Sequence, residues 1–316
     1  MALLVDDPLW PAHGTTWSHL VSDVSLEELH AFARDQRLPP RSFDLDHYDV
    51  PAGALDALVA AGAERVDRRT LLRRLSGSGL RVALVRRTEE RRRRLVADLR
   101  ARWAGLGERI AGVGATDAWV GLGDDLLERW QEPHRRYHDV RHLDGILLDL
   151  DQLAADGAEV SPAVELAAWF HDAVHGGRTP DDERASAELA SAALADPAIG
   201  PAGSPGLADE VARLVLTTAE HAGGDRDAAL LGDADLAILA APAGRYAEYA
   251  ADVRAEYAHV PDEDFASGRA AVLRALAEGG PIFSTPEGRA RWEERARVNV
   301  AAEIAELGTS STDPAG

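Results

Sequence analysis

Two patterns of apolar and polar residues follow one another along the chain. In the first part, short apolar runs alternate with segments whose apolar residues recur at helical spacing. These runs predict strands over residues 3–7, 63–66 and 80–85, and the helical spacing predicts helices over residues 25–36 and 68–75. Ser25 followed by Glu28 forms a capping box, and Asp67 is placed to cap the second helix. The alternation predicts a small α/β domain over residues 1–86.

From Asp117 onward the helical spacing continues and no convincing strand pattern interrupts it. The predicted helices cover residues 117–131, 139–155, 162–175, 181–195, 206–221, 233–240, 244–257, 262–278 and 286–307. We therefore expect an all-α domain over residues 117–308, a disordered polar tail over 309–316, and an arginine-rich helical linker over 87–116. The predicted fold is multi-domain, with a small N-terminal α/β domain followed by an all-α helical bundle.

The length and composition narrow the class of protein. A chain of 316 residues is long enough for two hydrophobic cores. No run of eighteen uncharged apolar residues is present, and Asp6 and Asp7 stand where a signal peptide would be basic and then apolar. We therefore expect a cytoplasmic protein without membrane association. Cysteine is absent, which excludes disulfides, thiolate nucleophiles and metal sites built from cysteine.

The charge of the chain is large but unevenly distributed. The formal net charge of -20 argues against nucleic acid as a partner of the whole chain, since nucleic-acid binding depends on neutralising phosphates. Residues 65–109 nevertheless contain fifteen arginines against five acidic residues. A nucleic-acid contact is therefore expected only through the arginine-rich segment 86–102, which is otherwise a solvated connector.

Three stretches carry the candidate chemistry. YHDVRHL, residues 137–143, has two histidines at positions that share one face of a helix. VELAAWFHDAVHGG, residues 164–177, is apolar on all sides before it reaches a His-Asp pair, and ALLGDADLAILAAP, residues 229–242, sets two aspartates in another apolar run. An isolated buried carboxylate costs several kcal/mol, so these aspartates must be paired or bind a metal.

Together the three stretches provide the ligands that a divalent metal takes when thiols are absent. Imidazole and carboxylate suit manganese first, and also iron, nickel, zinc or, less well, magnesium. Ligands placed on three separate helices would also give a bundle a common point of convergence.

The same stretches resemble the HD superfamily of metal-dependent phosphohydrolases, and most closely its bacterial branch of predicted HD phosphohydrolases, over about residues 117–307. The mark of this superfamily is a single histidine, an adjacent His-Asp pair and a distant aspartate on a helical bundle. Here the matching residues are His142, His171, Asp172 and Asp235. The resemblance implies an HD-type bundle that holds a divalent metal and hydrolyses a phosphomonoester or phosphodiester, with a nucleotide as the expected substrate.

YHDVRHL is also similar to the Tyr-His-Asn-x-x-His stretch of cyclic-nucleotide phosphodiesterases, with Asp139 in place of the asparagine. That similarity implies that His138 is a general acid and His142 a metal ligand. A bound metal lowers the pKa of water and polarises a phosphoryl oxygen, and Asp172 would orient that water. Arg135, Arg136 and Arg141 are candidate phosphate-binding residues because guanidinium groups form bidentate contacts with phosphate.

For several residues near these stretches, the sequence leaves two interpretations open. The family pattern favours Asp235 over Asp233 as the ligand, which leaves Asp233 to support a ligand or to cap a helix. His175 is a ligand for a second metal or the end of the helix before two glycines. Glu183 contacts the substrate or is one of the acids expected in a first helical turn.

Two functions from other classes stay open beside the hydrolase. The helical domain could be a metal-containing module that senses a nucleotide or binds RNA or protein with little or no catalysis. Alternatively, the histidines and aspartates pair with one another and are purely structural, in which case chelators would change nothing.

The N-terminal domain resembles a small bacterial domain family without an assigned function, on VDDPLWPAHGTTWSHLVSD and FDLDHYDVP. Its candidate site residues are Asp6, Asp7, His13, His19 and His47, which could form a second metal or nucleotide site. The alternative is a loop-rich core in which Trp10, Trp17 and Tyr48 pack beside hydrogen-bonded histidines.

Overall fold

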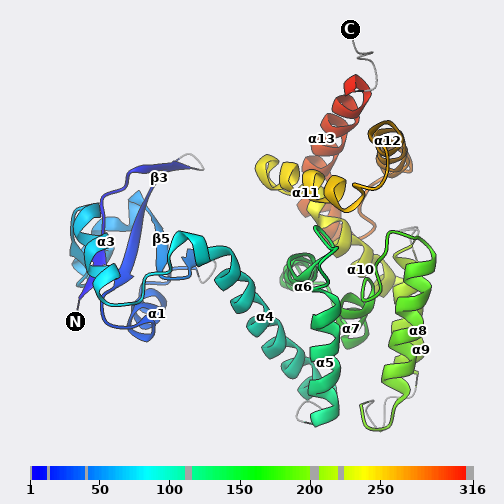
Figure 1. Cartoon of the computed structure of the whole chain (residues 1–316), viewed down its shortest axis with the longest axis horizontal. Coiled ribbons are helices and arrows are strands. Elements are labelled where there is room, and N and C mark those ends of the chain that lie inside the picture. The colour runs from blue at the N-terminus through cyan, green and yellow to red at the C-terminus, as the bar shows by residue number, and fades with distance from the viewer. Residues whose placement is uncertain are drawn as a thin grey trace. The chain divides into compact units, whose positions relative to one another are not determined.

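The structure is a computed structural model that describes residues 2–12, 15–39, 42–110, 116–199, 206–219 and 224–310. The chain divides into two compact units, Met1–Arg94 and Leu95–Gly316. The first unit is a small α/β domain and the second is helical, so the predicted fold class is confirmed (Figure 1). Among the described residues, no helix is long and apolar enough to cross a membrane.

A mixed sheet forms the centre of the first unit. Its described strands are β1 (Leu3–Val5), β2 (Trp10–Ala12), β3 (Thr15–Ser22), β4 (Phe43–Asp44), β5 (His47–Pro51) and β6 (Glu64–Arg65). The strand order is β4-β5-β3-β1-β6, and β2 pairs with β3. β1 is antiparallel to β3 and parallel to β6. The longest strand, β3, is therefore central to the sheet.

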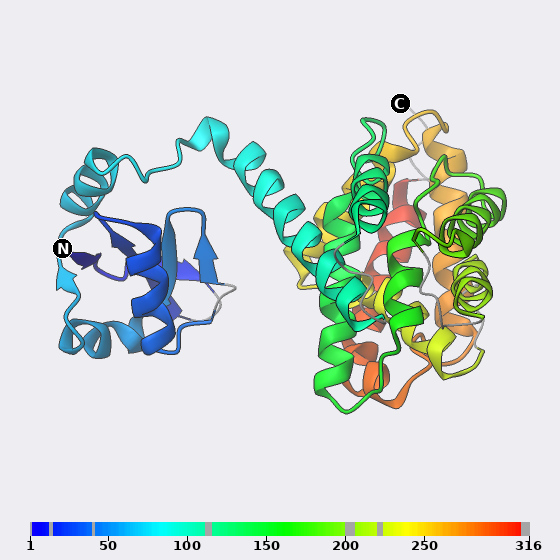
Figure 2. The ribbon, with the colours of Figure 1, turned by 90° about the horizontal axis from the view of Figure 1, so that it is seen from below.

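Helices cover both faces of this sheet (Figure 2). They are α1 (Leu26–Asp35), the 3₁₀ helix η2 (Ala52–Ala54), α2 (Leu55–Ala60) and α3 (Arg68–Gly77). Successive strand residues point to opposite faces, so Val5 packs with α1 and α2 whereas its neighbour Leu4 packs with Leu71 and Leu75 of α3. Burial of each of these aliphatic side chains contributes roughly 1.5–3 kcal/mol.

The observed caps of the helices in the first unit agree only in part with those predicted from the sequence. Ser25 accepts a hydrogen bond from the Glu28 amide, and Asp67 accepts one from the Thr70 amide, as predicted. The Glu28 carboxylate does not complete a capping box in the described hydrogen bonds, because it accepts from the hydroxyl of Ser22 at 2.5 Å.

The strand predicted over residues 80–85 is wrong. The backbone amide of Val82 donates to the carboxylate of Asp46 at 2.7 Å instead of to a neighbouring strand. Leu84 and Val85 are 84% and 90% exposed and begin helix α4. An apolar run therefore marks the start of a helix here. The strands over residues 15–22 and 47–51 lie in segments that the sequence suggested were loop-rich.

The second unit consists of helices. They are α4 (Leu84–Arg109), which begins in the first unit, then α5 (Asp117–Arg129), α6 (Val140–Ala155), α7 (Pro162–Phe170), α8 (Asp181–Ala195), α9 (Leu207–Thr217), α10 (Arg226–Leu236), the 3₁₀ helix η3 (Ala237–Ala240), α11 (Ala243–Glu256), α12 (Asp262–Glu278) and α13 (Pro286–Ser310). The linker predicted over 87–116 is α4 as far as Arg109, and residues 111–115 lie outside the described part. Of the tail predicted over 309–316, the described residues belong to α13.

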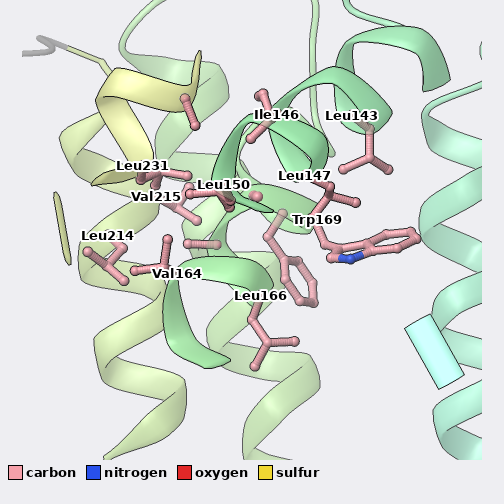
Figure 3. Packing of buried hydrophobic residues seen from close by; sticks show 14 of the residues in the cluster. Leu143, Ile146, Leu147, Leu150, Val164, Leu166, Trp169, Leu214, Val215 and Leu231 are labelled. Atoms are coloured by element: carbon pink, nitrogen blue, oxygen red, sulfur yellow. The ribbon is translucent and has the colours of Figure 1, made fainter. Parts of the chain in front are cut away.

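The core of the second unit is built from α6, α7, α9 and α10. Figure 3 shows Leu147 of α6 beside Trp169 of α7, and Leu150 of α6 beside Leu231 of α10. Val164 of α7 lies beside Leu214 of α9 in the same view. The residues of α7 from Ala163 to Phe170 are all buried, as predicted from their apolar pattern. The charged residue of this segment, Glu165, is also buried and pairs with Arg109 of α4 at 2.6 Å. The other residues are apolar on all sides because other helices surround α7.

Helix α7 ends earlier than predicted. It stops at Phe170, and His171 and Asp172 form the turn that follows. Three carbonyl groups of this segment are occupied outside the helix, since the His171 ring donates to Ala168 O and Arg135 donates to Asp172 O and Ala173 O. The prediction that the helix continues to residue 175 is therefore wrong. The His-Asp pair lies on a turn.

Candidate metal centre

Three helices bring the four predicted ligands to one place. Asp139 caps α6 by accepting from the Arg141 amide at 2.8 Å, so the helix begins at Val140 and His142 lies in its first turn. His171 and Asp172 follow the end of α7, and Asp235 lies in the last turn of α10. These are the elements that pack together in the core of the unit.

The ligand atoms of these residues converge. The Nε2 atoms of His142 and His171 are 3.4 Å apart. Asp172 Oδ2 lies 3.3 Å from His171 Nε2 and 3.9 Å from His142 Nε2. Asp235 Oδ1 lies 3.1 Å from His142 Nε2 and 3.8 Å from His171 Nε2. Two imidazole nitrogens and two carboxylate oxygens therefore surround one small space.

The environment of His171 favours metal binding through Nε2. Its Nδ1–H donates to Ala168 O at 2.9 Å, which leaves Nε2 to face the Nε2 atom of His142. Both histidines are buried, with 1% and 5% of their surface exposed. Two imidazole lone pairs at this separation repel each other, and a cation or a proton between them removes the repulsion. This donor set fits a divalent metal.

The protonation states of the same residues depend strongly on one another. Burial lowers the pKa of His142. Burial also opposes charge on His171, but the carboxylate of Asp172 outweighs it and raises the pKa of His171 to about 9. Burial alone would raise the pKa of Asp172, yet the positive charge of His171 holds it well below its usual range. Without a cation, the site therefore holds one imidazolium between carboxylates.

His138 lies beside this site and belongs to a second cluster. Its Nδ1–H donates to Glu256 Oε2 at 2.6 Å, and its ring centroid is 4.2 Å from that of His175 and 5.4 Å from that of His142. Burial opposes charge on His138, but the bond to Glu256 outweighs it and raises the pKa of His138. His138 precedes α6, so the two histidines of YHDVRHL do not share a helix.

Glu256 was not predicted from the sequence. It is the last residue of α11, its side chain is 4% exposed, and its Oε1 accepts from the backbone amides of Arg136, Tyr137 and His138. A carboxylate at the carboxyl end of a helix is unfavourable against the macrodipole. That unfavourable placement is the sequence signal that could have identified it.

The three predicted phosphate-binding arginines have different environments. The side chain of Arg135 is fully buried and donates to the carbonyls of His138, Asp172 and Ala173, so its guanidinium holds the backbone and does not face a substrate. Arg136 is exposed and donates to Pro133 O. Arg141 is exposed, pairs with Asp139 and Asp252, and lines a cavity at the site.

Asp233 and Glu183 lie away from the four ligands in the described contacts. Asp233 lies within α10 and accepts from the amides of Ser284 and Thr285 and from the Thr285 hydroxyl, so it holds the segment that precedes α13. The hydroxyl of Thr285 in turn accepts from the Gly288 amide of α13, so Thr285 and not Asp233 is the capping residue there. Glu183 accepts from the Thr179 hydroxyl at 2.8 Å within its own turn of α8.

Two cavities open beside the candidate ligands. The larger, of about 640 Å³, is lined by His138, Asp235, Tyr137, Tyr249 and Arg269, among others. The smaller, of about 280 Å³, is lined by His142 and Asp235 and by Arg141, Arg245 and Arg295. Both volumes are near or within the range of small-molecule sites, and arginines line both. Arg245, Arg269 and Arg295, which come from helices α11, α12 and α13, were not predicted as site residues.

The arginine-rich segment of α4 is largely engaged in ion pairs. Arg87 and Arg91 contact the carboxylate of Asp44 at 2.8 and 2.7 Å, and Arg93 and Arg94 pair with Glu90 on the same helix. These bonds satisfy part of the positive charge that would otherwise be available for phosphate groups.

Comparison with known proteins assigns one part of the chain. Residues 3–78 match the model of a family described as protein of unknown function (DUF4031). The expectation that the N-terminal domain is similar to a family without an assigned function is thereby confirmed. Neither a curated protein nor a solved structure matches the chain.

Proposed function

We propose that the second unit is a metal-dependent phosphohydrolase of the HD type, and that it acts on a phosphomonoester or phosphodiester, with a nucleotide as the expected substrate. The observation that carries the proposal is the convergence of His142 Nε2, His171 Nε2 and Asp172 Oδ2, with Asp235 Oδ1 opposite them. In that setting His142, His171, Asp172 and Asp235 hold the metal.

Manganese is the first candidate for the metal, ahead of iron, nickel, zinc and magnesium, and its role when bound is to activate water and polarise the phosphoryl group. Asp172 has a second function in this proposal. A carboxylate that binds a metal is ionised. It can therefore accept a hydrogen bond from the attacking water and orient it toward phosphorus.

His138 is the proposed general acid. Its imidazole is kept protonated by Glu256, and it lies at the edge of the larger cavity together with Asp235. A proton donated from this ring would neutralise the developing charge on the leaving oxygen. Glu256 accepts hydrogen bonds from three backbone amides of the segment that carries His138. It therefore fixes the position of the imidazole as well as its charge.

The substrate would occupy the cavities that Asp235 connects. Arg141 lies at the smaller cavity, where its guanidinium can exchange its exposed ion pairs for a phosphate. Tyr137 and Tyr249 line the larger cavity and offer aromatic surface to a base or another planar group.

The test combines elemental analysis of the purified chain with hydrolysis of p-nitrophenyl phosphate and bis(p-nitrophenyl) phosphate in manganese. We expect about one bound metal at this site and turnover in the wild type, and loss of both in Asp172→Asn. The matched control is Asp125→Asn, which changes an exposed aspartate of α5 and should retain both. Metal at this site without turnover would favour the sensing or binding module instead.

A further inference from the structure

A separate histidine cluster lies in the first unit, outside the helical domain. His19 is on β3, and His47 and Asp49 are on the neighbouring strand β5. His19 pairs directly with Asp49 in the antiparallel register, and His47 is two residues before Asp49. Since alternate residues of a strand share a face, the three side chains project from the same face of the sheet.

The ring nitrogens of this cluster converge on one carboxylate. Asp49 Oδ1 lies 3.4 Å from His47 Nε2 and 4.0 Å from His19 Nε2. The two rings are 4.9 Å apart and inclined at 74°. Their Nε2 atoms therefore approach Asp49 from two directions, as ligands of one ion would.

A buried carboxylate fixes each imidazole from behind. His19 Nδ1–H donates to Asp6 at 3.0 Å, and His47 Nδ1–H donates to Asp46 at 2.7 Å. Asp6 and Asp46 are only 1% and 2% exposed. Hydrogen bonding of Nδ1 to a carboxylate selects the tautomer in which Nε2 can bind a metal, and this pairing is usual for metal-bound histidines.

The surroundings of the cluster suit a cation with an open position. Three carboxylates, Asp6, Asp46 and Asp49, provide negative charge, and part of it is balanced by Arg87 beside Asp46. A cavity of about 160 Å³ borders both histidines, and the Asp49 side chain is 46% exposed. Two histidines and one carboxylate are the usual protein ligands of sites that leave a coordination position for water or substrate.

We propose that His19, His47 and Asp49 bind a divalent transition metal, zinc or iron(II), in a second site within the first unit. Asp6 and Asp46 are positioning residues that hold the two imidazoles. Of the earlier candidates, Asp7 pairs with the exposed Arg65, and His13 lies outside the described residues. The site does not depend on the hydrolase proposed for the second unit.

The competing arrangement needs no metal. Burial opposes charge on His47, but its bonds to Asp46 and Asp49 outweigh this and raise the pKa of His47 to about 9. A charged His47 would then simply pair with the two carboxylates. The two arrangements differ in metal content, which decides between them.

The experiment is a titration of the chelator-treated full-length chain with cobalt(II), followed by its visible absorption, together with elemental analysis for zinc and iron of the chain as purified. We expect two equivalents in the wild type, one in Asp49→Asn and one in Asp172→Asn. Because Asp49 is half-exposed, its variant retains the fold, and His47→Gln is the second variant. Asp56→Asn, an exposed change on α2, should keep both equivalents.

The outcomes separate the two sites. Unchanged stoichiometry in both Asp49→Asn and His47→Gln would overturn the proposal, as would a single wild-type equivalent that Asp172→Asn loses. A single wild-type equivalent that Asp49→Asn loses and Asp172→Asn keeps would support it while removing the metal from the helical unit. Asp6→Asn should weaken binding by roughly 10–100-fold, which is usual for a carboxylate behind a metal-bound histidine.

Discussion

His138 Nδ1 and Glu256 Oε2 are 2.6 Å apart, although 118 residues separate them in the sequence. The bond joins the turn before α6 to the end of α11, beside the candidate metal ligands. It raises the pKa of the His138 imidazole and fixes its position, and a general acid depends on both.

The contribution of His138 to kcat should depend on whether the leaving group must be protonated. We expect His138→Asn to lower kcat for phenyl phosphate by roughly 10²–10⁴-fold, the usual range for a general acid. The loss should be much smaller for p-nitrophenyl phosphate, because p-nitrophenolate leaves without being protonated. Steady-state rates for both esters in wild type and variant provide the test, and an equal loss for both would rule out the proposed role.

Glu256→Gln should shift the pH dependence of the same reaction. Glu256 raises the pKa of His138, and the acid acts only while protonated, so activity falls as the pH rises through that pKa. Removing the carboxylate charge lowers the pKa, and the alkaline limb of kcat should move to lower pH. If kcat of the variant is lower at every pH but its alkaline limb keeps the wild-type position, Glu256 has a structural role alone.

Metal removal should destabilise the helical unit. Without a cation, the carboxylates of Asp172 and Asp235 share a small space with the imidazoles of His142 and His171. We expect EDTA to lower Tm by several degrees and manganese to restore it, since a ligand that binds only the folded state stabilises it. In calorimetry of Asp172→Asn, the unfolding transition of the helical unit should not respond to either addition, whereas a response of that transition equal to that of the wild type would place the metal elsewhere.

Asp233 and Asp235 are two residues apart and should separate stability from metal binding. Asp233→Ala removes three hydrogen bonds at the start of α13 and should cost about 2–3 kcal/mol of unfolding free energy while the metal is retained. Asp235→Asn should lose the metal of the helical unit, and in the presence of EDTA its stability should differ little from that of the wild type. Urea denaturation and elemental analysis of both variants test this, and the reverse result would exchange the two assignments.

Arg135 and Arg136 provide a similar contrast. Arg135→Ala leaves the buried carbonyls of His138, Asp172 and Ala173 without their donor, and we expect a loss of about 3 kcal/mol together with weaker metal binding. Arg136→Ala changes an exposed side chain and should stay within about 0.5 kcal/mol. If Arg135→Ala instead raised KM without affecting stability, Arg135 would contact the substrate after all.

Ionisation of the Asp149 carboxyl should lower the stability of the helical unit at alkaline pH. Burial raises the pKa of Asp149 to about 7, so the folded chain binds this proton more tightly than the unfolded chain. Its contribution is therefore present below about pH 4 and is lost as the pH rises through 7. Asp149→Asn should be more stable than the wild type at pH 8, by on the order of 1–3 kcal/mol, and equal to it near pH 4. Asp125→Asn is the exposed control for the same pH series.

The four candidate ligands could be selected from the sequence because the pattern around them is local. Two apolar segments predict a buried carboxylate: one ends in His171-Asp172, and the other surrounds Asp235. A buried carboxylate requires a partner. Helices at 181–195 and 262–278 were predicted to the residue for a similar reason, since acidic first turns and apolar spacing lie within each segment.

The remaining features depend on contacts between distant segments. Glu256 meets His138 only after the helices have packed, and Arg135 ends α7 by taking carbonyls 37 and 38 residues away. Strand β3 was missed because its residues pair with β1, β2 and β5 in a register that local composition does not determine. The same is true of Asp49, which becomes a candidate ligand only through its pairing with His19.

The complete burial of α7 also determines how quickly the helical site can exchange its ion. Because residues Ala163–Phe170 are enclosed on every side, fraying of a surface segment cannot release His171 from its place at the end of the helix. An ion at the proposed site could enter through the cavities that Asp235 lines, or while the chain is still folding. Amide hydrogen exchange should then be slowest in α7, and the ion captured during biosynthesis would be retained for much of the lifetime of the protein.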